Sequence, residues 1–357
     1  MHGCFDSLGR VWPSSLLTVI AVSMFGAAAL ADEPLFDPPA FVAPAVLDAD
    51  QDAPLPTDES PPNQLWLINT RRLPRAGRHP AGQPAPEIEH YHADGQWSDA
   101  SLAELNAAYD PRLATVLLVH GNHTDEATAI SKGLTAFRAL TEPSPGARPL
   151  RLLVWSWPTD FIPGTVRRDA RVKAEWAEDE AFYLARFIAG LDRREAVTLV
   201  GYSFGARAIS GALHLLGGGS LAHRRLPSTG DDERAPLRAV LLAAAVDDDW
   251  LLPGHRHGRA LAAVERMVVT VNPQDRVLRW YRFLVPGSQA TALGSHGLGN
   301  QATLGQHARK LVQLNAHQAV GGQHGWASYI GSPEVVAQLR REMVVSSTRR
   351  HRTASRP

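Results

Sequence analysis

The sequence predicts an α/β protein with a doubly wound, mostly parallel sheet and helices on both faces. Three observations lead to this prediction. Short apolar runs alternate with amphipathic stretches, as the strands and crossover helices of a parallel sheet do. Residues 115–120 form a continuous apolar run, which is typical of a strand buried on both faces. A Gly-Tyr-Ser-Phe-Gly motif at 201–205 lies between another such run and a helical segment.

The first half of the pattern supplies strands and two helices. Four short runs are expected to be strands, at residues 65–70, 87–92, 115–120 and 150–155. Residues 125–140 have helical character. A long helix is expected over residues 166–191, because apolar side chains recur there at helical spacing: Val166, Ala170, Ala177, Leu184, Phe187 and Leu191.

The second half continues the alternation. Strands are expected at residues 196–200, 237–246, 265–271 and 310–315. Helices are expected at 206–216, directly after the serine motif, and at 335–343. The connection at 247–264 is too short for a large cap domain, which predicts an open or lightly covered site.

The ends of the chain differ in composition from its middle. Residues 1–31 have the features of a secretory signal peptide, with a cleavage site near Ala31, although the charged region before the apolar stretch is weak. The apolar stretch is about fifteen residues, shorter than the roughly twenty of a membrane-spanning helix. We therefore expect export to the periplasm or the medium, with an uncleaved N-terminal membrane anchor as the alternative. A disordered, acidic, proline-rich leader at 32–63, a domain at 64–345 and a basic disordered tail at 346–357 complete the expected organisation.

The composition gives no indication of a nucleic acid partner, a metal or a cofactor. The chain has 357 residues, 44% of them hydrophobic, and its formal net charge is zero, so no global attraction to nucleic acid is expected. His255 and His257 lack a carboxylate at ligand spacing, and His120 and His123 span a turn. No phosphate loop or dinucleotide fingerprint follows a strand. We expect neither a metal nor a cofactor.

Ser203, at the centre of the motif, is the predicted nucleophile. A serine hydroxyl becomes reactive when the backbone holds it exposed beside a base, with amide donors aimed at the developing oxyanion. A sharp strand-to-helix turn does this, and glycines two residues to either side let strand and helix pack closely. The motif by itself occurs by chance in many chains, and its position between strand and helix makes it informative here.

The orienting acid and the base should follow the serine along the chain, at the carboxyl ends of later strands. Asp275 follows the run at 265–271 and is the preferred acid, and Asp247 is the alternative; either carboxylate could instead cap a helix. The preferred base is His324, which lies between the last strand and the last helix. The rival histidines are His296, His307 and His317.

The oxyanion needs backbone N–H donors that are in place before charge develops. The N–H of Phe204 is one candidate, and the N–H of Asn122, in the His-Gly-Asn turn at 120–122, is the other. A turn without chemical role is the alternative for 120–122. Trp155 and Trp157 end the neighbouring strand and either wall an acyl pocket or belong to the core. Arg207 is expected to be a structural ion-pair partner.

Over about residues 110–343 these features resemble the α/β-hydrolase superfamily. Within it the chain is similar to a poorly characterised bacterial group with a His-Gly turn, a Trp-Pro pair after the next strand and an Asn-x-x-Asp acid loop, here at 120–121, 157–158 and 272–275. The resemblance implies an eight-stranded, mostly parallel sheet and ester hydrolysis without a cofactor. Its triad falls on Ser203, Asp275 and His324, and its oxyanion donors on Asn122 and Phe204.

The resulting hypothesis is a cofactor-independent serine hydrolase that cleaves carboxylic esters, or amides, through an acyl-enzyme. One alternative is a non-catalytic hydrolase-fold protein that binds a partner of the cell envelope. The other is an acyltransferase that uses the same triad. The sequence does not distinguish substrates, because one fold supports many chemistries.

Overall fold

The computed structural model describes residues 61–74, 85–144, 147–192, 194–227, 235–285 and 290–343. The expected signal peptide and basic tail, and all but the last residues of the expected leader, lie outside these ranges, so the domain boundaries and the export of the chain stay predictions. Within the described part of the chain, no helix is both long and apolar enough to cross a membrane.

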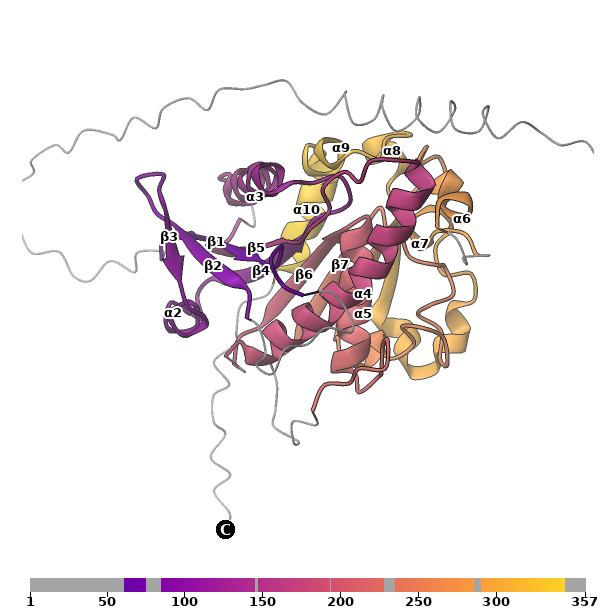
Figure 1. Ribbon diagram of the computed structural model, residues 1–357, viewed down its shortest axis with the longest axis horizontal. Coiled ribbons are helices and arrows are strands. Elements are labelled where there is room, and N and C mark those ends of the chain that lie inside the picture. The colour runs from indigo at the N-terminus through magenta and orange to yellow at the C-terminus, as the bar shows by residue number, and fades with distance from the viewer. Residues whose placement is uncertain are drawn as a thin grey trace, which may run out of the picture.

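A single nine-stranded sheet runs through the molecule in the order β3-β2-β1-β5-β4-β6-β7-β8-β9 (Figure 1). Strand β2 is antiparallel to its neighbours β1 and β3, and every other pair is parallel. The strands are β1 Gln64–Asn69, β2 Glu87–Tyr91, β3 Trp97–Ala100, β4 Ala114–Val119, β5 Leu150–Ser156, β6 Val197–Tyr202, β7 Leu237–Leu242, β8 Arg266–Val271 and β9 Leu311–Asn315.

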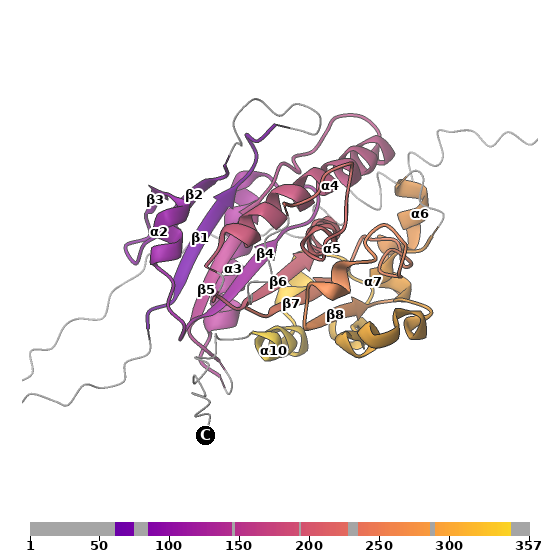
Figure 2. The ribbon, with the colours of Figure 1, turned by 90° about the horizontal axis from the view of Figure 1, so that it is seen from below.

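Helices cover both faces of this sheet. Helices α4 (Val166–Gly190) and α5 (Phe204–Leu216) pack against each other on one face, and α3 (Glu126–Thr141) and α10 (Pro333–Glu342) lie on the other (Figures 1 and 2). The remaining helical segments are short. They are α2 Leu102–Ala107, α6 Tyr281–Leu284, α7 Leu293–His296, α8 His317–Val320, α9 Trp326–Ile330, and the 3₁₀ segments η1 Ala260–Ala262, η2 Leu278–Trp280 and η3 Gln301–Lys310.

The order of the central strands creates a crevice at their carboxyl ends. From β4 the chain crosses to β5 in one direction, and from β5 it returns past β4 to β6 and goes on to β7. Because the two crossovers run in opposite directions, their helices lie on opposite faces and leave a crevice beyond the ends of β4 and β6. Every residue of β4, β5 and β6 is buried, as the apolar runs predicted.

Three differences from the expected elements have physical reasons. Strand β3 was not predicted, because four residues of mostly polar sequence give no hydrophobic pattern. Helix α2 was not predicted either, although Ser101 and Glu104 form a capping box that marks its start. Strand β7 ends at Leu242, earlier than expected, because Ala243 has a φ of 45° and leads the apolar residues after it out of the sheet.

Candidate active site

Ser203 lies at a sharp turn between β6 and α5. Its φ is 54° and its ψ is −117°, and residues other than glycine rarely adopt a positive φ. A Cβ atom on Gly205 would lie 2.1 Å from the carbonyl oxygen of Val119, and one on Gly201 would lie 2.7 Å from Cα of Ala206. Only glycine at both positions lets α5 approach β4 and β6 closely enough to form this turn.

The N-terminus of α5 lacks the side-chain cap of the other long helices. Asp125, Thr165 and Ser332 cap α3, α4 and α10 by accepting a hydrogen bond from a first-turn N–H group. Ser203 holds the same position before α5 and makes no such bond. Its hydroxyl is therefore available for chemistry, and the N–H of Phe204, at the positive end of the helix dipole, has no acceptor within the helix.

Three side chains from three loops form one chain of hydrogen bonds. Nε2 of His324 lies 3.2 Å from Oγ of Ser203, and Nδ1 of His324 lies 2.8 Å from Oδ2 of Asp275. A carboxylate at Nδ1 favours the tautomer protonated there, which leaves Nε2 to accept from the serine hydroxyl. The side chain of Asp275 is fully buried and that of His324 is 13% exposed. The structure thus brings together the three residues selected from the sequence.

The loop that carries Asp275 is bound to the loop that carries His324. Oδ1 of Asp275 accepts bonds of 2.9 and 2.8 Å from two backbone N–H groups at the start of η2, so the carboxylate caps that segment and still presents Oδ2 to the imidazole. Nδ2 of Asn272 donates to the carbonyl of Gly321 at 2.8 Å. The hydroxyl of Tyr202 donates to the carbonyl of His324. These bonds hold the Asp275 loop and the backbone of His324 in place beside the serine–histidine contact.

The alternative acid, Asp247, has a different partner. Its Oδ1 accepts a hydrogen bond of 2.6 Å from the hydroxyl of Tyr281, which in turn accepts one of 3.1 Å from Arg207. Arg207 also lies 3.6 Å from a carboxylate oxygen of Glu178, which confirms its expected structural role. None of the three rival histidines lines the cavity around Ser203: His296, His307 and His317.

The turn after β4 lies directly beside the serine. A Cβ atom on Gly121 would lie only 3.0 Å from Cβ of Ser203, so a side chain at this point would press on the serine. Asn122 and Phe204 both line the cavity that holds Ser203. The two residues expected to supply oxyanion donors therefore lie next to the serine hydroxyl.

Trp157 clamps this turn and does not line the cavity. Its indole Nε1 donates to the carbonyl of His120 at 2.9 Å, and its backbone N–H donates to Nε2 of His120 at 3.2 Å. Nδ1 of His120 lies 2.9 Å from the carbonyl of Gly121. Burial lowers the pKa of His120 well below its ordinary value, so the ring is neutral, as an accepting Nε2 requires. Trp155 and Trp157 are both buried, which favours the core interpretation over the pocket wall.

A buried carboxylate that the sequence analysis missed holds the next residues of the turn. Oδ2 of Asp169, on α4, accepts a 2.8 Å bond from Nδ2 of Asn122 and lies 2.9 Å from Nε2 of His123. Nζ of Lys173 lies 3.8 Å from Oδ1. Burial by itself raises the pKa of Asp169, but hydrogen bonds from His123, Asn122 and the backbone of Ile162 together lower it below its ordinary value. Asp169 is therefore ionised and positions Asn122.

The sequence contained a signal for this carboxylate. Asp169 and Lys173 are four residues apart on α4. Asp169 is also next to Ala170, one of the residues whose apolar spacing predicted the buried face of this helix. Charged residues are seldom fully buried unless they are paired. A charged pair at this spacing on an apolar helix face therefore indicates a buried polar network.

The strand order and the geometry of the serine turn decide the fold. The chain has an α/β-hydrolase fold. The segments that carry Ser203, Asp275 and His324 follow β6, β8 and β9, which is the chain order of this fold. The expected resemblance to this superfamily is thereby confirmed at the level of the fold. The sheet has nine strands where about eight were expected, and β3 at its edge is the additional one.

Comparisons with known proteins give only distant similarities. No family model matches the chain, and no curated protein matches it. Similar solved structures include esterase B from Lactobacillus rhamnosis inhibited by a tributyrin phosphonate, with 12% identity over 94% of this chain and 97% of that chain and a TM-score of 0.40. Acyl-protein thioesterase 2 from Zea mays has 13% identity over 64% of this chain and 92% of its own, with a TM-score of 0.36. The product of gene lin2722 from Listeria innocua has 10% identity over 66% and 96%, with a TM-score of 0.38.

The cavity at Ser203 has a volume of about 330 Å³ and two unlike walls. One wall is apolar and comes mostly from the segment after Asp275, with Val277, Leu278, Leu284 and Val285. The other wall comes from α3, which lies on the other side of the site (Figure 1), and carries Thr128, Ser131, Lys132 and Thr135. The short segment after β7 adds no cap domain between Asp247 and Val264, as its length predicted.

Within the described ranges, no group of three or more histidine, cysteine, aspartate or glutamate side chains is arranged to hold a metal ion.

Proposed function

We propose that this protein is a serine hydrolase that cleaves carboxylic esters through an acyl-enzyme intermediate on Ser203. The observation that carries the proposal is the hydrogen-bonded chain Ser203–His324–Asp275, with contacts of 3.2 and 2.8 Å, at an uncapped helix N-terminus. A nucleophile, a base and an orienting acid in hydrogen-bond contact are the requirements of nucleophilic acyl transfer by such a triad. The chemistry needs no group beyond the side chains and backbone of this chain.

Acylation begins when Oγ of Ser203 attacks the ester carbonyl carbon. Nε2 of His324 accepts the hydroxyl proton as the new carbon–oxygen bond forms, and Asp275 stabilises the resulting imidazolium through Nδ1–H. The carbonyl oxygen becomes an oxyanion, which the backbone N–H groups of Phe204 and Asn122 stabilise. Removing one such donor costs about 3 kcal/mol of transition-state stabilisation.

The intermediate then collapses and the ester bond breaks. Nε2 of His324 gives its proton to the departing alkoxide, so an alcohol leaves and Ser203 carries the acyl group. Water enters the vacated position, and His324 removes its proton as the oxygen attacks the acyl carbon. The acid product leaves when the serine oxygen regains its proton from His324.

The unlike cavity walls support esters with an apolar acyl part of moderate size. The wall formed by Val277, Leu278, Leu284 and Val285 can bury such a group, because burial of apolar surface stabilises by about 25 cal/mol per Å². The α3 wall offers hydroxyl groups and Lys132 to a polar leaving group.

A fluorophosphonate probe and p-nitrophenyl butyrate test the proposal. The wild-type protein should be labelled and should hydrolyse the ester, and Ser203→Ala should lose labelling and about 10⁶ of kcat, as in a worked serine protease. A matched control exists, because Oγ of Ser98 lies 2.6 Å from Nε2 of His92 on an exposed hairpin without a turn of this kind. Ser98→Ala should keep both labelling and hydrolysis.

Two results would overturn the proposal. Equal labelling of wild type and Ser203→Ala would place the nucleophile elsewhere. A folded wild-type protein that neither reacts with the probe nor hydrolyses any short-chain ester would leave a non-catalytic binding protein as the better account.

A further inference from the structure

Arginine and aromatic side chains gather beside the mouth of the cavity. The segment at 276–285 supplies apolar residues to the cavity wall and exposes a different set to solvent. The exposed residues of this segment are Arg276, Arg279, Trp280, Arg282 and Phe283. One segment thus connects the proposed acyl-binding wall with the outer surface.

The start of α4 extends the same surface. Helix α4 contacts α6, and the two lie side by side in both ribbon views (Figures 1 and 2). The first turns of α4 and the loop before it expose Phe161, Arg167, Arg168 and Arg171. We call these four residues and the five of the 276–285 segment the mouth patch.

The aromatic part of the mouth patch is unusually exposed for this protein. Phe161 is 61% exposed, Phe283 52% and Trp280 38%, and among the described residues only Leu102 is a comparably exposed large hydrophobic side chain. Leu102 begins α2, which lies beyond the opposite side of the sheet (Figure 1). Rings of Trp280 and Phe283 are 5.8 Å apart. Exposed apolar side chains that gather in one place indicate an interaction surface.

The charge of the mouth patch is positive although the formal net charge of the chain is zero. Of its six arginines, Arg171 lies 3.4 Å from Glu175, and within the described part of the chain no ion pair involves the other five. The guanidinium of Arg282 lies over the ring of Phe283, 4.7 Å from its centroid.

Nearby carboxylates already have partners. Asp169 and Asp275 are buried in the networks described above. Asp160 bonds to Arg71 at 2.7 Å, Asp248 accepts a bond from Thr291, and Asp249 lies 3.1 Å from His255. Within the described part of the chain, none of these five carboxylates forms an ion pair with an arginine of the mouth patch.

We infer that the mouth patch binds the surface of an anionic lipid bilayer and turns the cavity towards it. Arginines attract anionic headgroups, while tryptophan and phenylalanine beside them enter the boundary between headgroups and acyl chains. The aromatic residues adjoin the apolar cavity wall, which favours a lipid surface over a nucleic acid. Binding depends only on the patch, and the use of this orientation to take up lipid-dissolved esters rests on the proposed function.

Vesicle sedimentation of the full-length Ser203→Ala protein tests the binding without any turnover. The protein should sediment with vesicles of phosphatidylcholine and phosphatidylglycerol in a two-to-one ratio and remain in solution with phosphatidylcholine alone. Added salt should weaken the binding, because the charges are at the surface. Failure to sediment with the anionic vesicles would overturn the inference, as would equal binding to both kinds.

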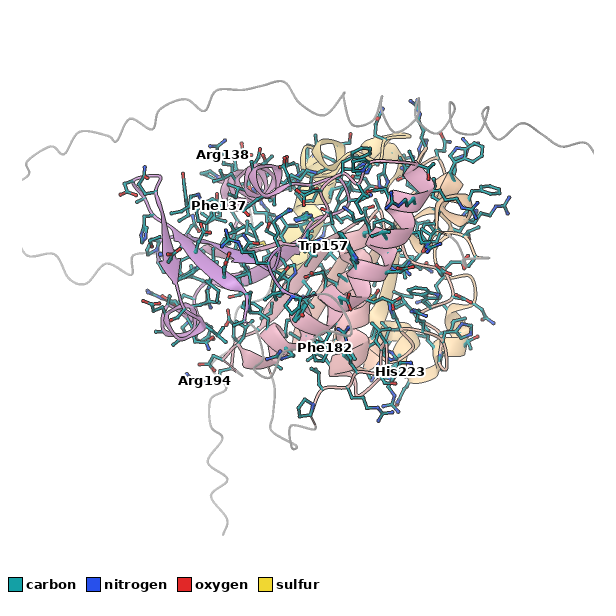
Figure 3. All side chains as sticks on the ribbon, viewed as in Figure 1. Phe137, Arg138, Trp157, Phe182, Arg194 and His223 are labelled. Atoms are coloured by element: carbon teal, nitrogen blue, oxygen red, sulfur yellow. The ribbon has the colours of Figure 1, made fainter. Side chains whose placement is uncertain are left out.

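Charge-matched variants localise the binding. Replacing Arg279 and Arg282 by glutamine should weaken binding about twenty-fivefold, because each arginine near an anionic surface contributes about fivefold. The control replaces Arg112 and Arg194, which are 57% and 81% exposed, by glutamine. Arg194 comes just before β6, at the amino ends of the strands and so away from the cavity at their carboxyl ends (Figure 3). The control should stay within twofold of the parent. Equal weakening by both pairs would show that net charge, not the mouth patch, drives binding.

Two further measurements keep this inference separate from the proposed function. Trp280→Ala/Phe283→Ala, in the catalytically competent chain, should weaken vesicle binding and leave hydrolysis of a soluble ester unchanged. If the wild-type protein bound vesicles through the mouth patch but hydrolysed no ester, the proposed function would be refuted and the inference about the mouth patch would stand. Patch-dependent binding of double-stranded DNA without vesicle binding would assign the patch to another polyanion and refute the lipid surface.

Discussion

The loops after β7 and after β8 each place a buried aspartate at the same edge of the sheet, and only one of the two reaches a histidine. Asp275 comes four residues after the end of β8 and contacts His324 at 2.8 Å. Asp247 comes five residues after the end of β7 and contacts the hydroxyl of Tyr281 at 2.6 Å. Both aspartates are thus buried and follow a strand. They differ in the side chain that each carboxylate contacts, His324 for Asp275 and Tyr281 for Asp247.

The two carboxylates also differ in what they stabilise. Asp247 ends a chain of bonds that runs through Tyr281 to Arg207 on α5 and so joins a loop to a helix. Burial raises the pKa of Tyr281, so its hydroxyl stays a proton donor to Asp247 at every ordinary pH. Asp275 instead has one oxygen in a cap and one on the imidazole. The first arrangement stabilises the fold, and the second fits the orienting role of Asp275 in the proposed function.

The variant that best distinguishes the two loops should be Asp275→Asn, with the largest expected loss of kcat. An amide at this position favours the wrong tautomer of His324, and the analogous change in a worked serine protease lowers kcat by about 10⁴. Steady-state hydrolysis of p-nitrophenyl butyrate measures it, with thermal unfolding as the check on folding. If Asp247→Asn lost as much activity as Asp275→Asn, the assignment of roles to the two loops would fail.

An intermediate loss of kcat should come from Asp169→Asn, because Asp169 on α4 binds Asn122 beside Ser203. The variant loses the charge that holds Asn122 and His123, so the oxyanion donor of Asn122 moves, and kcat should fall about a hundredfold with little change in KM. Asp169→Glu should restore part of the loss. A rise in KM at constant kcat would contradict a role in positioning the oxyanion donor.

Asp169 also predicts a pH dependence of stability. Its folded-state pKa is lowered, so its contribution is fully present above the unfolded pKa of about 3.9 and is lost as pH falls through the folded pKa. The difference in free energy of unfolding between wild type and Asp169→Asn should therefore be largest above about pH 5 and shrink at lower pH. A difference that grows on acidification would contradict this sign.

The smallest effect on activity should come from Asp247→Ala. The variant leaves the buried Tyr281 hydroxyl without the carboxylate that accepts its hydrogen bond, which should lower the free energy of unfolding by about 2 kcal/mol. Activity should stay within threefold of wild type, because the contacts of Ser203, His324 and Asp275 remain. Urea unfolding and ester hydrolysis measured on the same preparation test this, and a large loss of kcat at unchanged stability would refute it.

The elements of the central sheet were predictable because their signals are local. The buried strands β4, β5 and β6 are continuous apolar runs, and α4 shows apolar residues at helical spacing over its whole length. The edge strand β3 was not predictable, because pairing of mostly polar residues with β2 leaves no trace in hydrophobicity. The apolar residues after Leu242 were misassigned, since hydrophobicity reports burial and not strand pairing.

Local patterns were sufficient to predict the α/β class, the turn that carries Ser203 and a short list of candidate acids and bases, because glycine spacing and apolar runs act over a few neighbouring residues. The three-dimensional arrangement was needed to show that Asp275 and not Asp247 contacts His324, that Trp157 binds the turn at 120–122, and that Asp169 binds Asn122. These contacts join residues that lie tens of positions apart. They depend on which loops the strand order brings to one edge, and no local pattern encodes that.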